Sequence, residues 1–185
     1  MYFLRKNYVA AARCYRNVLS AKPGDAEALR NLESMKGASV LEANRLIDSG
    51  QRTEALSLAR EAIVNDPDSP DLLNILGRLT GEDAAAQLAQ AENALAANPG
   101  NVNLQNTIKQ KRTELQQAIV YLEKAHKLNP EHASVCENLG IAYASVHRFN
   151  EALPLLEKAL NLYTEEKDKE RTRANLQIMR AQSGK

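Results

Sequence analysis

Residues 132–164 have the sequence HASVCENLGIAYASVHRFNEALPLLEKALNLYT, in which apolar side chains recur at helical spacing. The first half places Val135, Leu139 and Tyr143 on one helix face, and Gly140 removes a side chain where a second helix must come close. The second half carries apolar residues at i, i+1, i+4, i+7 and i+8, which are Ala152, Leu153, Leu156, Ala159 and Leu160. The stretch therefore predicts two closely packed antiparallel helices.

The same pattern recurs along the chain. Ala-rich amphipathic runs end at Pro23, Pro67, Pro99 and Pro130, and Thr164 takes the proline position of the last copy. Apart from the longer first step, these positions are separated by about 34 residues, a period that predicts a helical-hairpin repeat. Small residues fill matching positions before these prolines, among them Ala55, Ala62, Ala94, Ala118 and Ala125. In this register, Leu76-Gly77 belongs to the helix that precedes the run ending at Pro99.

The best copy resembles the tetratricopeptide repeat (TPR). The matching residues are Leu139-Gly140, Tyr143, Phe149, Ala152, Leu156 and Ala159, and Thr164 departs from the usual closing proline. The resemblance implies an all-α fold, a right-handed superhelical solenoid of stacked antiparallel helix pairs. It also implies a non-catalytic scaffold that binds a partner protein or peptide along its concave face.

The repeat register predicts three regions. Residues 1–36 form an incomplete first repeat plus an extra helix, residues 37–164 form about four hairpins, and residues 165–185 form a charged capping helix and tail. Tyr2 aligns with a position near the end of a first helix. We therefore expect the chain to be a fragment of a longer array, or a regulatory segment of a larger enzyme.

Three segments leave the number of helices open. For residues 25–48 we favour a break at Gly37, followed by a capping box at 39–42; the alternative is one long helix. Residues 71–79 and 83–97 are predicted as two helices separated by Thr80-Gly81. Residues 101–129 contain a second capping box, Thr113 to Gln116, or else form one continuous helix.

Composition excludes several classes of function. The chain has 185 residues, 44% of them hydrophobic, and a net charge of +1, which predicts neither a nucleic-acid footprint nor membrane insertion. No phosphate-binding loop, nucleophile motif or metalloprotease motif is present. His132 and Cys136 lie one helical turn apart but lack a second convergent pair. We expect no catalytic residues, no metal and no cofactor.

Amide side chains recur once per predicted repeat. Asn44, Asn74, Asn106 and Asn138 follow one another at intervals close to one repeat length, and Arg78 and Gln110 extend the second and third positions by one turn. An amide can pair with both groups of a peptide backbone, so these six residues are the predicted peptide-binding set. The alternative is that they are ordinary solvated asparagines. The paired Lys and Arg residues that clamp chaperone C-termini in some TPR domains are missing.

A second hypothesis is self-association. An incomplete first hairpin would leave an apolar end, which can pair with another copy of the chain. The residues predicted to form this surface are Tyr2, Phe3, Leu4, Tyr8 and Tyr15.

Overall fold

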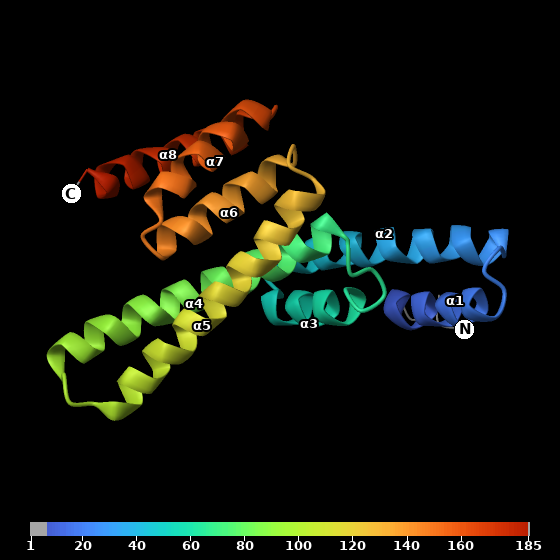
Figure 1. The fold of residues 1–185 in the computed structure, drawn as a ribbon, viewed down its shortest axis with the longest axis horizontal. Coiled ribbons are helices and arrows are strands. Elements are labelled where there is room, and N and C mark those ends of the chain that lie inside the picture. The colour runs from blue at the N-terminus through green and yellow to red at the C-terminus, as the bar shows by residue number, and fades with distance from the viewer. Residues whose placement is uncertain (1–6, 185) are drawn as a thin grey trace. The chain divides into compact units, whose positions relative to one another are not determined.

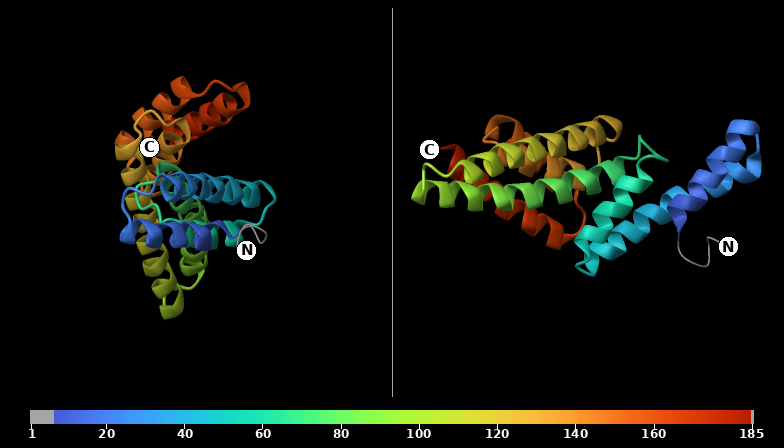
Figure 2. Two further views of the ribbon diagram at one scale, coloured as in Figure 1. Left: turned by 90° about the vertical axis from the view of Figure 1, so that its right-hand side faces the viewer. Right: turned by 90° about the horizontal axis from the view of Figure 1, so that it is seen from below.

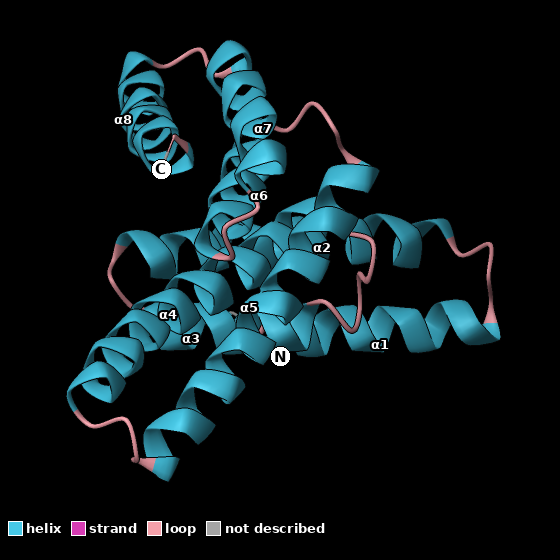
Figure 3. Cartoon of the chain, turned by 60° about the vertical axis from the view of Figure 1, so that its left-hand side comes forward, coloured by secondary structure: helices cyan, strands magenta, loops and turns pink. Residues whose placement is uncertain are grey.

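The computed structural model describes residues 7–184, and every regular element within that range is an α-helix (Figure 1, Figure 3). It divides into two compact units, Met1–Ile75 and Leu76–Lys185. The helices are α1 (Tyr8–Ala21), α2 (Ala26–Asp48), α3 (Arg52–Ala62), α4 (Pro70–Ala97), α5 (Val102–Leu128), α6 (Ala133–Ser145), α7 (Phe149–Leu162) and α8 (Glu166–Ser183).

In the first unit, α2 packs against both α1 and α3. Ala11, Ala12 and Met35 form the buried contact between α1 and α2. On α3, Ala55 and Ala59 are fully buried, and these small side chains let the helix axes approach closely. Asp25 caps α2 by accepting a hydrogen bond from the Ala28 N–H at 3.0 Å. That bond and the neighbouring Lys22 ammonium lower the pKa of the Asp25 carboxyl.

The predicted break at Gly37 is wrong, because α2 is one helix of 23 residues. Its buried residues, Ala28, Met35, Ser39 and Ala43, continue one stripe across the glycine. Ser39 does not cap a new helix; its hydroxyl donates to the Met35 carbonyl oxygen at 2.8 Å, within the helix. A glycine in a helix costs about 1 kcal/mol relative to alanine, and the continuous packed stripe outweighs that cost.

In the second unit, α6 and α7 form the hairpin predicted for residues 132–164. Val135, Leu139, Ala152, Leu156 and Ala159 are all buried in it. The absence of a side chain at Gly140 allows the close approach, since a Cβ there would lie 2.9 Å from Leu156 Cγ and 3.1 Å from the Ala152 carbonyl oxygen. The two helices therefore cross at the position that the sequence predicted.

The turn between the two helices has the same geometry in α2–α3 and in α6–α7. Gly50 and His147 both have left-handed backbones, with φ of 79° and 61°. The N–H of Gln51 donates to the Leu46 carbonyl at 2.8 Å, and the N–H of Arg148 donates to the Tyr143 carbonyl at 2.9 Å. Each turn is therefore a Schellman motif, in which glycine is the preferred residue at the left-handed position.

His147→Gly is expected to stabilise the α6–α7 hairpin, because a non-glycine residue is strained at positive φ. The expected gain is roughly 0.5–1 kcal/mol in the free energy of unfolding, measured by urea denaturation. Gly50→Ala, at the matching position of α2–α3, is the control and should lose a similar amount. A His147→Gly variant less stable than wild type would contradict this interpretation of the turn.

The α4–α5 pair is much longer than the other hairpins. The predicted break at Thr80-Gly81 is wrong, because α4 is continuous over 28 residues. Of the two alternatives left open for residues 101–129, the structure shows the continuous helix, α5, of 27 residues. The Thr113 hydroxyl donates to the Lys109 carbonyl at 3.1 Å, as it would inside a helix. Consequently the run that ends at Pro99 is not a separate repeat but forms the end of α4.

The contacts of Gly77 show which parts of α4 and α5 correspond to the two helices of a repeat. A Cβ on Gly77 would overlap Leu122 Cγ and lie 3.0 Å from the Ala118 carbonyl oxygen. Ala118 and Leu122 thus occupy the places that Ala152 and Leu156 hold opposite Gly140. The predicted assignment of Leu76-Gly77 to the run ending at Pro99 is therefore wrong. Gly77 and Ala118 lie much farther apart in the sequence than Gly140 and Ala152 do, so this repeat carries an insertion of nearly one repeat length.

The insertion lengthens both helices of this repeat, and we call residues 83–114 the arm. Figure 2 shows α4 and α5 running side by side along it. Ala84, Leu88, Ala91 and Ile108 form its buried core together with Leu115. Arg112 pairs with Glu92 across the two helices at 2.9 Å. The arm is therefore a packed two-helix extension of one repeat.

The last helix, α8, packs on α7 and contacts α6. Thr172 and Leu176 are buried, and Met179 is partly buried against the α5–α6–α7 core. A buried carboxylate on α6, that of Glu137, accepts hydrogen bonds from Arg171, Thr172 and Asn175 of α8. This polar contact fixes the position of α8 on the hairpin.

Candidate functional site

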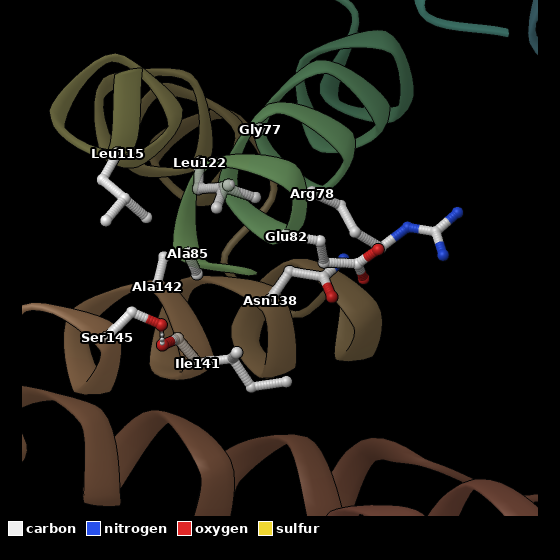
Figure 4. Close-up of a pocket in the computed structure, with 11 residues that line it drawn as sticks. Gly77, Arg78, Glu82, Ala85, Leu115, Leu122, Asn138, Ile141, Ala142 and Ser145 are labelled. Atoms are coloured by element: carbon white, nitrogen blue, oxygen red, sulfur yellow. Dashed lines mark hydrogen bonds between the residues drawn. The ribbon is translucent and has the colours of Figure 1, made fainter. Parts of the chain in front are cut away.

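A pocket of about 200 Å³ lies between α4, α5 and α6, inside the second unit (Figure 4). It is lined by Gly77, Arg78, Gly81, Glu82, Ala85, Leu115, Leu122, Asn138, Ile141, Ala142 and Ser145. Pockets that hold drug-sized molecules usually measure about 300–1,000 Å³. This pocket is smaller, so it suits a single inserted side chain better than a whole small molecule.

Two glycines on α4 contribute to the lining of the pocket. Gly77 and Gly81 are one helical turn apart, and both face Ala118 of α5, so that the two helices lie close together along one wall of the pocket. Leu115 and Leu122 of α5 line the pocket, and Ala142 of α6 lies opposite. The result is a mainly apolar concavity, which favours the burial of an apolar group from water.

Polar groups stand at the rim. Figure 4 shows Arg78, Glu82 and Asn138 on one side of the pocket and Ser145 on the other. The Ser145 hydroxyl donates to the Ile141 carbonyl oxygen at 3.0 Å. Glu82 and Asn138 also have partners within the chain, whereas Arg78 has no hydrogen bond or ion pair to any of residues 7–184. Arg78 and Glu82 are the two charged residues that line the pocket.

Known proteins share the repeat and the fold of this chain. The tetratricopeptide repeat family model matches residues 132–166, which contain the α6–α7 hairpin. Residues 132–166 are a tetratricopeptide repeat. The predicted fold class, an all-α solenoid of stacked helix pairs, is confirmed, because the crystal structure of yeast Tom70 shares the fold over 98% of this chain with a TM-score of 0.55.

Identity to these solved structures is low. Tom70 is 16% identical, and this chain spans only 38% of the Tom70 chain. TTC0263, a TPR protein of Thermus thermophilus, is 20% identical over 80% of this chain and 83% of its own, with a TM-score of 0.40. MamA of Desulfovibrio magneticus is 17% identical over 94% and 86%, with a TM-score of 0.36. No curated protein sequence matches the chain.

Of the six residues predicted to bind a peptide, the structure brings two together at the pocket. Arg78 on α4 and Asn138 on α6 both line it. Asn106 and Gln110 lie on α5 within the arm, where both are exposed and the Gln110 amide donates to Glu114 at 2.8 Å. These two residues therefore do not continue the series of one amide per repeat, because the arm interrupts the repeat register.

The remaining predicted residues lie in the first unit. Asn44 is exposed on α2, and Asn74 is 8% exposed on α4. Of the residues predicted for self-association, Tyr8 and Tyr15 pack partly buried against the α1–α2 core. Tyr2, Phe3 and Leu4 lie outside the described residues. Both the binding role of Asn44 and Asn74 and self-association through the tyrosines stay predictions.

The nucleophilic and metal-binding side chains are in ordinary surroundings. Cys136 Sγ lies 3.4 Å from the Pro130 carbonyl oxygen and 3.7 Å from His126 Nδ1. Burial raises the pKa of the Cys136 thiol and lowers the pKa of His126, so Cys136 lacks the thiolate character of a reactive cysteine. Within residues 7–184, no three His, Cys, Asp or Glu side chains converge as metal ligands would.

The described helices include none with both the length and the hydropathy of a membrane span. The tetratricopeptide repeat, the family matched by residues 132–166, is generally a non-catalytic protein-interaction module.

Sequence reasoning misses the apolar part of the pocket. The pattern identifies Gly77 as a packing residue, but it makes Gly81 a helix end and gives no signal at Ala85. The available signal is the spacing Gly-x-x-x-Gly within a helical pattern. Two glycines one turn apart on the same face indicate either close helix packing or a groove, and here Gly77 provides the packing while both line the pocket.

Proposed function

We propose that this protein binds a segment of a partner protein by inserting one apolar side chain into the pocket between α4, α5 and α6. The observation that supports the proposal is the combination of an apolar interior with a rim of Arg78, Glu82 and Asn138. In a TPR array the first helices of successive repeats line the concave face. Here α4 and α6 are the first helices of two consecutive repeats, so the pocket lies on the surface where the fold is expected to bind peptides.

The energetics favour an aliphatic anchor. Burial of a leucine-sized side chain contributes roughly 1.5–3 kcal/mol, which corresponds to roughly ten- to a hundredfold in affinity. The polar groups at the rim can then orient the peptide backbone, since an amide such as that of Asn138 can both donate and accept.

A phage-displayed library of random dodecapeptides tests the proposal. Peptides enriched on the wild-type protein should bind Ala85→Phe about tenfold or more weakly, because the larger side chain fills the pocket. Ala86→Phe is the matched control, since Ala86 is the next residue of α4 and is exposed. Affinities are measured by fluorescence anisotropy, and circular dichroism verifies that each variant is folded.

Ser145→Phe provides a second obstruction from the opposite side of the pocket. Peptides that bind both pocket variants as tightly as Ala86→Phe would overturn the proposal, and so would a library that yields no binder.

A further inference from the structure

We propose that the partner segment carries an acidic side chain next to its apolar anchor and that Arg78 binds this carboxylate. The inference rests on the proposed function and specifies the chemistry of its ligand. It concerns the residues of the partner that lie next to the inserted apolar side chain, which the shape of the pocket does not determine.

The position of Arg78 carries the argument. Arg78 of α4 lines the pocket, and its side chain extends outward from it on the side where Glu82 and Asn138 lie (Figure 4). The side chain is partly buried, and no group within residues 7–184 forms a hydrogen bond or ion pair with it. A guanidinium has five N–H donors in a planar fork, which a carboxylate satisfies through two parallel hydrogen bonds.

Glu82, the other charged residue at the rim, does not satisfy the preference of Arg78 for a carboxylate partner. Glu82 is one helical turn from Arg78, at a spacing that permits an ion pair, but the two side chains are not paired and Glu82 is engaged elsewhere in the chain. An exposed ion pair between residues at that spacing is weak. A ligand carboxylate beside the apolar pocket can therefore compete with Glu82 for the Arg78 guanidinium. α5 and α6 contribute no charged residue to the lining. Arg78 is therefore the unmatched charge that a ligand meets.

Charge reversal tests the inference. Peptides selected on wild-type protein should pair an aliphatic residue with Asp or Glu within two positions. Selection on Arg78→Glu should keep the aliphatic residue and replace the acid with Lys or Arg. Lys109→Glu is the matched control, because it makes the same change in net charge at an exposed position of α5 outside the pocket, and it should still select acidic peptides.

Affinity measurements give the second readout. A wild-type-selected peptide should bind Arg78→Gln about fivefold more weakly, and the difference should shrink at high salt. Peptides that depend on Ala85 but not on Arg78, or that show no enrichment of acidic residues, would overturn this inference and leave the proposed function standing. Peptides indifferent to both positions would overturn both.

Discussion

Gly77→Ala is expected to destabilise the second unit, although alanine is the better helix former. The new Cβ would overlap Leu122 Cγ and lie 3.0 Å from the Ala118 carbonyl oxygen. Leu122 lines the pocket and can shift partly into it, but the Ala118 carbonyl oxygen belongs to the helix backbone of α5 and cannot move aside as a side chain can. Overpacking of this kind costs roughly 1–3 kcal/mol, and the close contact with a backbone atom places Gly77 near the upper end.

Gly37→Ala is the matched control. Gly37 also lies within a helix, but a Cβ there meets no atom within 4 Å. The substitution should therefore stabilise the chain by roughly 0.5–1 kcal/mol through helix propensity alone. Urea denaturation of both variants measures the two effects. The same change should have opposite signs at the two positions, and a Gly77→Ala variant as stable as wild type would contradict the packing described for α4 and α5.

The glycines inside helices also show why the fold was only partly predictable from sequence. The α6–α7 hairpin was predicted correctly because its Leu-Gly pair, its turn and its small residues fall in one unbroken register. Gly37 and Gly81 resembled helix ends because local chemistry favours a stop at glycine. Whether a helix stops depends on the apolar stripe beyond the glycine, as in Ala84, Leu88 and Ala91, and on the partner that buries it.

The candidate site was predictable to a similar extent. Arg78 and Asn138 were predicted because they follow the repeat register. Asn106 entered the same series by coincidence, since the insertion that forms the arm is close to one repeat in length. The pocket itself depends on Gly77 packing against Ala118 and Leu122, a pairing across the whole arm that no local pattern reveals.

Loss of the Glu137 carboxylate is expected to have the largest effect on stability. Its side chain is 3% exposed and accepts five hydrogen bonds, one of 2.7 Å from the Arg171 guanidinium and one of 2.8 Å from the Tyr163 hydroxyl. The buried Thr172 hydroxyl donates at 3.0 Å. Arg171 is 51% exposed and can be hydrated when Glu137 is removed, but the Thr172 and Tyr163 hydroxyls lose a charged acceptor at roughly 1–3 kcal/mol each, so the expected total is roughly 3–5 kcal/mol.

The acidity of Glu137 follows from the same contacts. Burial alone would raise its pKa, but the hydrogen bonds from Arg171 and Tyr163 outweigh burial and hold the pKa of Glu137 below its ordinary value. Burial and the adjacent carboxylate raise the pKa of Tyr163, so its hydroxyl remains protonated and donates. A pKa lowered by folding means that the unfolded chain binds protons first as the pH falls. The stabilisation by Glu137 is therefore complete at neutral pH and declines in acid.

Glu137→Ala should thus lose roughly 3–5 kcal/mol at pH 7, and hydrogen exchange should show α8 losing protection before the rest of the second unit. Glu137→Gln keeps the shape and removes the charge, so its deficit relative to wild type should shrink as the pH falls below the ordinary glutamate value of about 4.3. Glu151→Gln is the control, because Glu151 pairs with Arg148 at an exposed position and should change little. A Glu137→Gln deficit that stays constant down to the pH of acid unfolding would mean that packing, and not the buried charge, fixes α8 on the hairpin.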